Sequence, residues 1–167
     1  MTTAAPPKQA SNGELIRWAF DRINDHDVAP LREFWTKDTV EHFPDRSCRG
    51  PEEIGGYFEE TFRAIPDFRM EVVSLAEQGD DVFVQWHLTG THEGTLLGIE
   101  PTGKRLSIDG IDHFVVRDGK VVSNLVKVDQ LDYARQIGMM PPDGSATDRA
   151  MKAAFNLRTK LLRRLKR

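Results

Sequence analysis

One carboxylate lies on what the sequence predicts to be the apolar face of a strand. Residues 104–117 alternate between apolar and polar side chains, as a half-buried strand does. Asp112 falls on the apolar side of that alternation, together with Ile108 and Phe114. An ionised carboxylate among apolar side chains is costly unless it is paired or used. The pattern indicates a polar spot in an apolar pocket, where burial would raise the pKa of Asp112 and suit it to proton transfer beside a carbonyl group.

The turn at residues 118–119 decides what lies opposite Asp112. A two-residue turn places Asp112 opposite Leu125, whereas a three-residue turn with a bulge places it opposite Asn124. We favour the second arrangement, in which the inner face of the following strand carries Val122, Asn124, Val126 and Val128.

The neighbouring strand adds an aromatic side chain to the predicted pocket. Its alternation places Val82, Val84 and Leu88 on one face with Trp86, which we expect to form a pocket wall. Glu41 and His42 are adjacent in an extended segment, so only one of them can point inward. His92 lies in a glycine-rich loop, where it could contact a ligand or hold the loop backbone.

Helical spacing and start signals predict the elements that hold these strands. Ser11 and Glu14 form a capping-box pair before an amphipathic helix, and Pro30 and Pro51 each begin another helix. Residues 38–44 read as a short extended piece and residues 45–50 as a loop. The period then changes to two, which predicts strands at 68–77, 82–90, 104–117 and 120–129.

Helices followed by antiparallel strands are typical of the α+β class. We expect a cone-shaped α+β barrel, in which a curved antiparallel sheet and the N-terminal helices enclose a pocket. The predicted organisation is a disordered tail at 1–10, a barrel domain at 11–143 and a C-terminal amphipathic helix at 144–167. The basic segment 160–167 could contact an anionic membrane or another polyanion, although a solvated helix end is the simpler interpretation.

Bulk properties narrow the class of protein. The net charge of −3 gives no reason to expect a nucleic-acid partner, and no apolar run approaches the length of a membrane span. Cys48 is the single cysteine, which excludes an internal disulfide framework and favours a cytoplasmic location. No spacing of histidines and carboxylates matches a metal-binding motif, so no metal is expected.

Three short motifs resemble those of a known family. The segments GTHEG at 90–94, GIEPT at 98–102 and DGK at 118–120 are similar, in sequence and in their gaps, to the pattern of the SnoaL-like polyketide (ester) cyclases. The sequence QIG at 136–138 resembles the ending of that family's domain. The resemblance implies the nuclear-transport-factor-2-like fold, cofactor-independent chemistry and a homodimer formed through the open face of the sheet.

The resemblance also implies where the catalytic groups should lie. The family's general acid/base aspartate, used in an intramolecular aldol closure, falls on Val126, which cannot carry a proton. The supporting histidine and glutamine fall on Asp112 and Gly110, and a supporting asparagine falls on Glu41 or His42. The related epoxide-hydrolase branch would also need an aspartate in place of Val126.

We therefore predict a proton-transfer site that differs from that of the relatives. The predicted catalytic residues are Asp112 and His42, and the predicted substrate-binding residues are Glu41, Trp86, His92, Ile108, Phe114, Asn124 and Val126. The expected function is that of a cyclase, or a related isomerase or hydrolase, acting on a small apolar carbonyl compound. The alternatives are a non-catalytic protein that binds a small apolar ligand and a protein whose sheet serves dimerisation.

Overall fold

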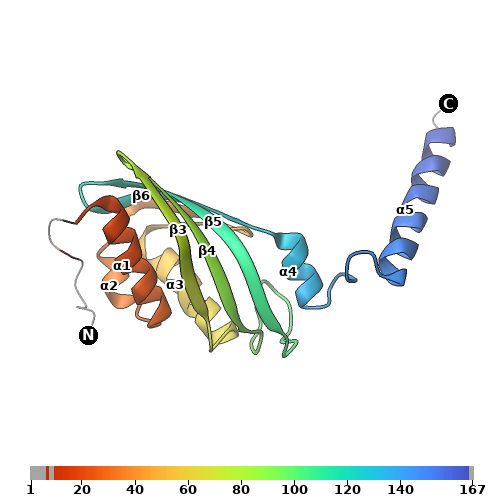
Figure 1. Cartoon of the computed structure of the whole chain (residues 1–167), viewed down its shortest axis with the longest axis horizontal. Coiled ribbons are helices and arrows are strands. Elements are labelled where there is room, and N and C mark those ends of the chain that lie inside the picture. The colour runs from red at the N-terminus through yellow and green to blue at the C-terminus, as the bar shows by residue number, and fades with distance from the viewer. Residues whose placement is uncertain (1–6, 8–9, 166–167) are drawn as a thin grey trace.

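The computed structural model describes residue 7 and residues 10–165, and shows a curved sheet with helices on one face (Figure 1). The helices are α1 (Asn12–Asn24), α2 (Ala29–Arg32), α3 (Gly50–Ala64), α4 (Gln130–Gln136) and α5 (Ala146–Leu165). The strands are β1 (Trp35–His42), β2 (Ser47–Arg49), β3 (Arg69–Gln78), β4 (Asp81–Thr91), β5 (Arg105–Arg117) and β6 (Lys120–Val128). The predicted N-terminal tail lies mostly outside the described residues.

The sheet confirms the predicted meander and adds a connection that the sequence did not predict. Its strand order is β2-β1-β6-β5-β4-β3, and β3 to β6 pair with their neighbours in antiparallel fashion. However, β1 pairs in parallel with β6, which places the early extended segment beside the last strand. The predicted loop at 45–50 contains β2, which pairs with β1. Glu41 and Asn124 are therefore register partners although they are far apart in the sequence.

Local sequence signals explain most of the helices that cover the sheet. The predicted capping box at Ser11 and Glu14 begins α1, and proline stands near the start of α2 and of α3. The α4 helix was not predicted; its N-cap is Asp129, whose carboxylate accepts hydrogen bonds from two backbone amides of the first turn. The main core lies between the sheet and α1 to α3, with Ile16, Phe20, Leu31 and Ile54 almost fully buried.

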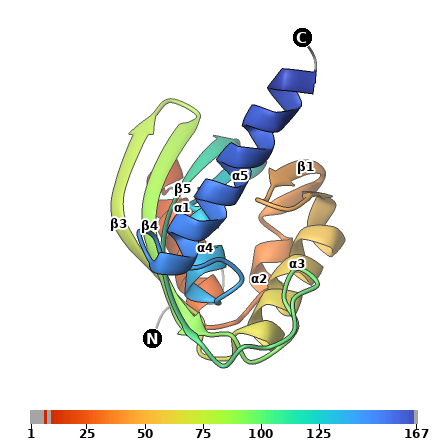
Figure 2. The same cartoon turned by 90° about the vertical axis from the view of Figure 1, so that its right-hand side faces the viewer.

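The concave side of the sheet and the helices form a cone, as expected. α1, α2 and α3 lie against one side of the sheet, whereas α4 follows β6 at the other end and α5 extends away from the body (Figures 1 and 2). Among the described helices, none is both long and apolar enough to cross a membrane. The division of the chain into a barrel domain and a terminal helix stays a prediction.

Candidate active site

The cone contains a cavity of about 320 Å³. Its walls come from the helices, from the concave face of the sheet, and from the loop between β4 and β5. Most lining side chains are apolar or aromatic, and four of the predicted residues are among them: Trp86, Ile108, Phe114 and Val126. A concave apolar cavity with few polar groups is the usual form of a small-molecule site. The interior is therefore not a filled core, as a purely structural sheet would require.

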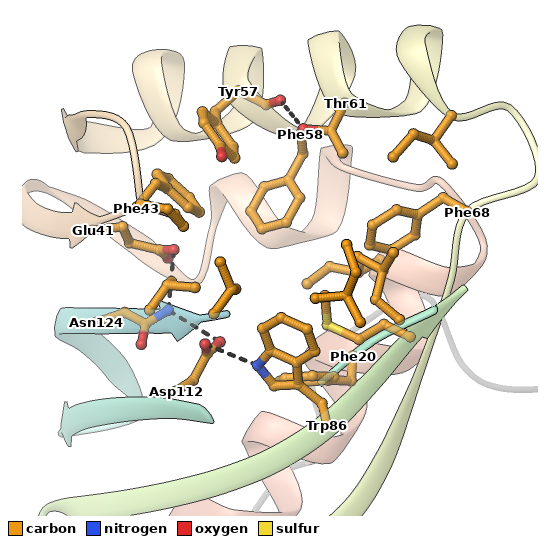
Figure 3. A pocket seen from close by; sticks show the side chains of 18 of the residues that line it. Phe20, Glu41, Phe43, Tyr57, Phe58, Thr61, Phe68, Trp86, Asp112 and Asn124 are labelled. Atoms are coloured by element: carbon orange, nitrogen blue, oxygen red, sulfur yellow. Dashed lines mark hydrogen bonds between the residues drawn. The ribbon is translucent and has the colours of Figure 1, made fainter. Parts of the chain in front are cut away.

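Four polar side chains form a cluster at one wall of the cavity (Figure 3). Trp86 donates a hydrogen bond from Nε1 to Asp112 Oδ1 at 2.9 Å. The amide Nδ2 of Asn124 lies 3.4 Å from Glu41 Oε2 and 3.4 Å from Asp112 Oδ2, so it connects the two carboxyl groups. Glu41 and Asp112 are only 2% and 6% exposed. The chain thus places two buried carboxyl groups beside one amide, facing apolar space.

Burial makes both carboxyl groups weaker acids than they are in water. Loss of solvation, reinforced by the nearby Asp112 charge, raises the pKa of Glu41 from 4.5 to about 8. Burial raises the pKa of Asp112 from 3.8 to about 7, although hydrogen bonds from Trp86 and Asn124 partly oppose the shift. Near neutral pH the pair therefore carries about one proton, held mainly by Glu41, while Asp112 is able to accept a second.

The hairpin between β5 and β6 combines the two-residue turn of the first predicted arrangement with a bulge, as in the second. Asp118 and Gly119 have φ values of +49° and +71°, as a two-residue turn of type I′ requires. A register shift then follows, in which Val115 pairs with Ser123 and Val116 pairs with Val121. Val122 is the extra residue of this bulge and is 39% exposed, so its predicted inward placement was wrong.

The bulge brings Asp112 opposite Val126 rather than opposite Asn124 or Leu125. Directly opposed residues on one face of an antiparallel pair have Cβ atoms about 5 Å apart. The carboxylate of this chain therefore lies one strand away from the position to which the resemblance assigns the general acid/base. Asn124 and Val126 do face the cavity, as predicted.

Gly110 makes room for the indole that holds Asp112. Gly110 is the register partner of Trp86, and a Cβ atom at this position would lie 2.2 Å from the Trp86 ring. Only a residue without a side chain lets the indole approach the β5 backbone this closely. This role of Gly110 was not predicted, although a glycine on the apolar face of a strand is itself a signal of close approach.

The predicted catalytic role of His42 does not fit its position. His42 is exposed, and its Nδ1 lies 2.8 Å from Ser47 Oγ on β2. Successive side chains on a strand point to opposite faces, and it is Glu41 that points into the cavity. Glu41, predicted to bind substrate, thus takes the place in the site that His42 was expected to occupy.

His92 also lies outside the cavity, contrary to its predicted role in substrate binding. It is fully buried, and its Nδ1 lies 3.1 Å from Thr102 Oγ1 across the loop. Its backbone amide donates to Lys104 and its carbonyl oxygen accepts from Gly103. Burial lowers the pKa of His92, which favours the neutral ring. The histidine of the GTHEG motif therefore holds the β4–β5 loop together.

Four aromatic side chains of the cavity wall were not among the predicted site residues. The rings of Phe43 and Tyr57 stack with centroids 3.7 Å apart, and those of Trp35 and Phe58 stack at 6.0 Å. All four residues line the cavity. The adjacent aromatic residues of α3 could have been recognised as an inward face. The contribution of Phe43 depends on where β1 ends.

No set of three or more histidine, cysteine or carboxylate side chains is placed to hold a metal ion within the part of the chain that the structure describes. The carboxylate side chains that line the cavity are Glu41 and Asp112.

Comparison with known proteins identifies the family. The sequence profile of the SnoaL-like polyketide cyclases matches residues 14–137, which include every strand and the polar cluster. The chain belongs to the SnoaL-like polyketide cyclase family. This SnoaL-like protein is 30% identical over 131 residues to the aklanonic acid methyl ester cyclase DauD of Streptomyces sp. (strain C5), covering 75% of this chain and 80% of that protein.

One further relative and two solved structures are similar to this chain. The SnoaL-like chain is 28% identical over 122 residues to the nogalonic acid methyl ester cyclase of Streptomyces nogalater, covering 73% of this chain and 90% of that one. The solved structure of TsrD from Streptomyces laurentii matches with a TM-score of 0.71 at 24% identity, over 80% of this chain and 99% of that chain. An NTF2-like protein of Cytophaga hutchinsonii matches at 0.59 and 15% identity, over 75% and 96% of the two chains. These structures support the NTF2-like fold.

Proposed function

We propose that this SnoaL-like protein is a cofactor-independent acid–base enzyme that closes a ring in a small, uncharged carbonyl compound. The observation that carries the proposal is the pair of buried carboxyl groups, Glu41 and Asp112, joined by Asn124 at the wall of an apolar cavity. Two such groups can supply an acid and a base at one site when their pKa values lie near neutral pH. The methyl esters named for the two ester cyclases belong to this substrate class.

The proposed roles follow from the proton balance of an aldol closure. The Asp112 carboxylate removes a proton from a carbon next to a carbonyl group, which leaves an enolate. The enolate carbon then forms a bond to a second carbonyl carbon of the same molecule, and the oxygen of that carbonyl receives a proton from the neutral Glu41 carboxyl. The pair still holds one proton afterwards, and transfer from Asp112 to Glu41 restores the starting state.

The position of Asp112 supports its role as the base. Asp112 faces Val126 across the β5–β6 ladder, so its carboxyl starts close to the position of the family's acid/base aspartate. The stacked aromatic side chains of the cavity wall would hold a flat apolar substrate beside the carboxyl pair. Nothing cationic lines the cavity among the described residues, which favours an ester over a free acid.

The test uses aklanonic acid methyl ester and nogalonic acid methyl ester as probes. Turnover is followed as a change in chromatographic retention without a change in mass. Because general acid–base catalysis typically contributes about 10²–10⁴-fold, Asp112→Asn should lower kcat by at least roughly 100-fold and leave ligand binding nearly unchanged. His42→Ala, which alters an exposed side chain of the same region, is the matched control and should keep full activity.

A relocated carboxylate gives a sharper version of this test. In the Asp112→Asn background, Val126→Asp restores a carboxyl on the facing residue and should recover part of the lost kcat. The pH–rate profile of the wild type should rise as Asp112 ionises near pH 7 and fall as Glu41 ionises near pH 8. The rise, which is the lower limb of this profile, should be absent in Asp112→Asn. Equal turnover by wild type and Asp112→Asn would contradict the proposal.

A binding protein without catalysis is the second candidate, favoured by the replacement of the family's acid/base residue by Val126. Tight binding of either ester with no turnover at any pH would select this function.

We infer two further properties. The first is a homodimer through the outer face of the sheet, where Val73, Phe83, Ile111 and Leu125 are exposed. The second is a cytoplasmic location, because Cys48 is a free thiol and a lone free thiol is typical of a reducing compartment.

A further inference from the structure

The last helix, α5, has no partner in the structure. It extends away from the body (Figure 1), and nearly all of its side chains are exposed. Its first turn is nevertheless fixed: the buried Asp148 accepts a hydrogen bond from the Gly144 amide and pairs with Lys152 at 2.7 Å. Lys152 also pairs with Asp143 of the preceding loop at 3.1 Å. The chain thus anchors the start of a 20-residue helix and leaves its surface free.

The helix has two faces of different chemistry. At 100° per residue, one sector roughly 120° wide carries mostly apolar side chains. Its members are Met151, Ala154, Phe155, Leu161, Leu162 and Leu165; we call this sector the apolar stripe. Phe155 and Leu165 are 64% and 83% exposed. The opposite face carries Arg149, Lys152, Lys160 and Arg163. An exposed stripe of this size is unusual on a helix that has no partner.

The charge of the C-terminal segment is opposite to that of the rest of the chain. Residues 146–167 contain 8 Lys and Arg against a single acid, whereas residues 1–145 contain 15 against 25 Asp and Glu. A helix with a basic polar face, low net hydrophobicity and Phe and Leu on its other face is characteristic of surface binding to anionic lipid. A nucleic acid would satisfy the basic face but would leave the apolar stripe uncovered.

Arg158 argues against the pairing of two α5 helices through their stripes. It lies in the middle of the apolar stripe, halfway between Met151 and Leu165. Full overlap of two stripes in antiparallel orientation, or in-register parallel pairing, would therefore bring two Arg158 side chains together. Asp148 is the only acid of the helix, so no facing carboxylate could neutralise them. At a lipid surface, by contrast, the long Arg158 side chain can reach the phosphate groups.

The acidic surface of a second molecule of this protein is another possible binding partner for α5. Three of the four exposed glutamates of α3 are already paired, Glu52 and Glu59 with Arg32 and Glu60 with Arg46, and the fourth, Glu53, accepts a hydrogen bond from the Arg49 amide. This use of the acidic side chains makes α3 a weaker receptor for a cationic helix than a surface of anionic headgroups.

The cavity lies close to the same end of the molecule. Leu97 and Met139 line the cavity and are 47% and 62% exposed, so they mark an apolar rim. Met139 stands shortly before α5 in the chain, and Figure 2 shows α5 in front of the space between the sheet and α3. A surface that binds α5 would therefore lie near the opening through which an apolar ligand enters.

We propose that α5 is a membrane-surface helix that binds anionic lipid through its apolar stripe and basic face and holds the cavity opening near the bilayer. The helix lies in the interface and does not cross the membrane. This binding is independent of whether the cavity is catalytic.

The test is co-sedimentation of the full chain with vesicles of phosphatidylcholine alone or of an equimolar mixture with phosphatidylglycerol. We expect binding to the mixed vesicles, little binding to phosphatidylcholine, and weaker binding as salt increases. The double variant Phe155→Gln/Leu162→Gln should lower the partition coefficient at least about tenfold, because two large apolar side chains leave the interface. Lys160→Gln/Arg163→Gln should lower it roughly tenfold to thirtyfold.

Asn156→Gln is the matched control, since it places the same amide on the polar face and should bind as the wild type does. Absence of binding to mixed vesicles, or unchanged binding by the Phe155→Gln/Leu162→Gln variant, would overturn the proposal. The mass of the lipid-free protein, measured by light scattering, distinguishes lipid binding from pairing of the apolar stripe with another protein molecule. A mass that falls in the Phe155→Gln/Leu162→Gln variant would assign the stripe to a protein interface and overturn the proposal.

Discussion

Glu41 and Asp112 show how a fold can adjust acid strength without any nearby cation. Both side chains lie in an apolar wall, and their main source of stabilisation is hydrogen bonding from Asn124 and from the indoles of Trp35 and Trp86. These bonds do not replace full hydration, so the ionised form is penalised in the folded chain. The same burial that prepares the pair for proton transfer must therefore reduce stability at high pH.

This effect predicts the behaviour of Glu41→Gln. The folded-state pKa of Glu41, about 8, lies above its ordinary value of 4.5, so the wild type loses folding free energy as pH rises from about 4.5 to 8. Glu41→Gln removes the ionisation and should melt close to the wild type at pH 5. At pH 8.5 it should be more stable by about 4–5 kcal/mol. Thermal unfolding across this pH range measures the difference; a difference that shrinks as pH rises would contradict the assigned burial.

At the scale of the elements, the site depends on the contact between β4 and β5. Trp86 can donate to Asp112 because Gly110 leaves space for its ring. The two-residue turn and the bulge at Val122 then set which residues of β6 face the cavity. Neither Gly110 nor the turn with its bulge is part of the carboxyl pair, Glu41 and Asp112, yet they determine which side chains surround Asp112.

Gly110→Ala should therefore displace the Trp86 indole. We expect a loss of about 1–3 kcal/mol in stability, typical of overpacking, and a pKa of Asp112 above its present value of about 7 because the indole bond would be weakened. The lower limb of the pH–rate profile should move to higher pH. Gly56→Ala on α3, where a Cβ atom meets nothing within 4 Å, is the matched control and should be neutral or stabilising. An unshifted limb in Gly110→Ala would show that the indole does not tune Asp112.

At the scale of the whole molecule, the two faces of the sheet have different exposures. The concave face lines the cavity, whereas the outer face exposes Phe83 at 47% and Ile111 at 51%. The imidazoles of His87 and His113 lie on this outer face, paired with Asp109 and Asp81. Apolar side chains rimmed by polar groups are typical of an interface between proteins.

If the outer face forms the proposed homodimer, Ile111→Lys should weaken it. Two like charges would face an apolar contact, and the mass measured by light scattering should fall toward that of one chain. Leu131→Lys, at a residue of similar exposure on α4, is the control and should leave the mass unchanged. A wild-type mass equal to one chain at all concentrations would refute the dimer.

Much of the architecture could be predicted from local patterns. Capping at Ser11, the proline starts of α2 and α3, the period-two strands and the glycine turn at Gly119 all depend on near neighbours in the chain. The inward placement of Asp112 also followed from the alternation of its own strand.

Other features depended on pairing between distant segments. Selection of Glu41 over His42 required the register of β1 against β6, and the opposition of Asp112 to Val126 required the bulge at Val122. A shift of a single residue reverses the face of every later side chain on a strand, so spacing alone could not fix these pairs. The sequence by itself therefore determined that a carboxylate would be buried on β5. Only the tertiary structure decided that Glu41 and Asn124 would meet it, because the parallel contact between β1 and β6 joins residues 83 positions apart.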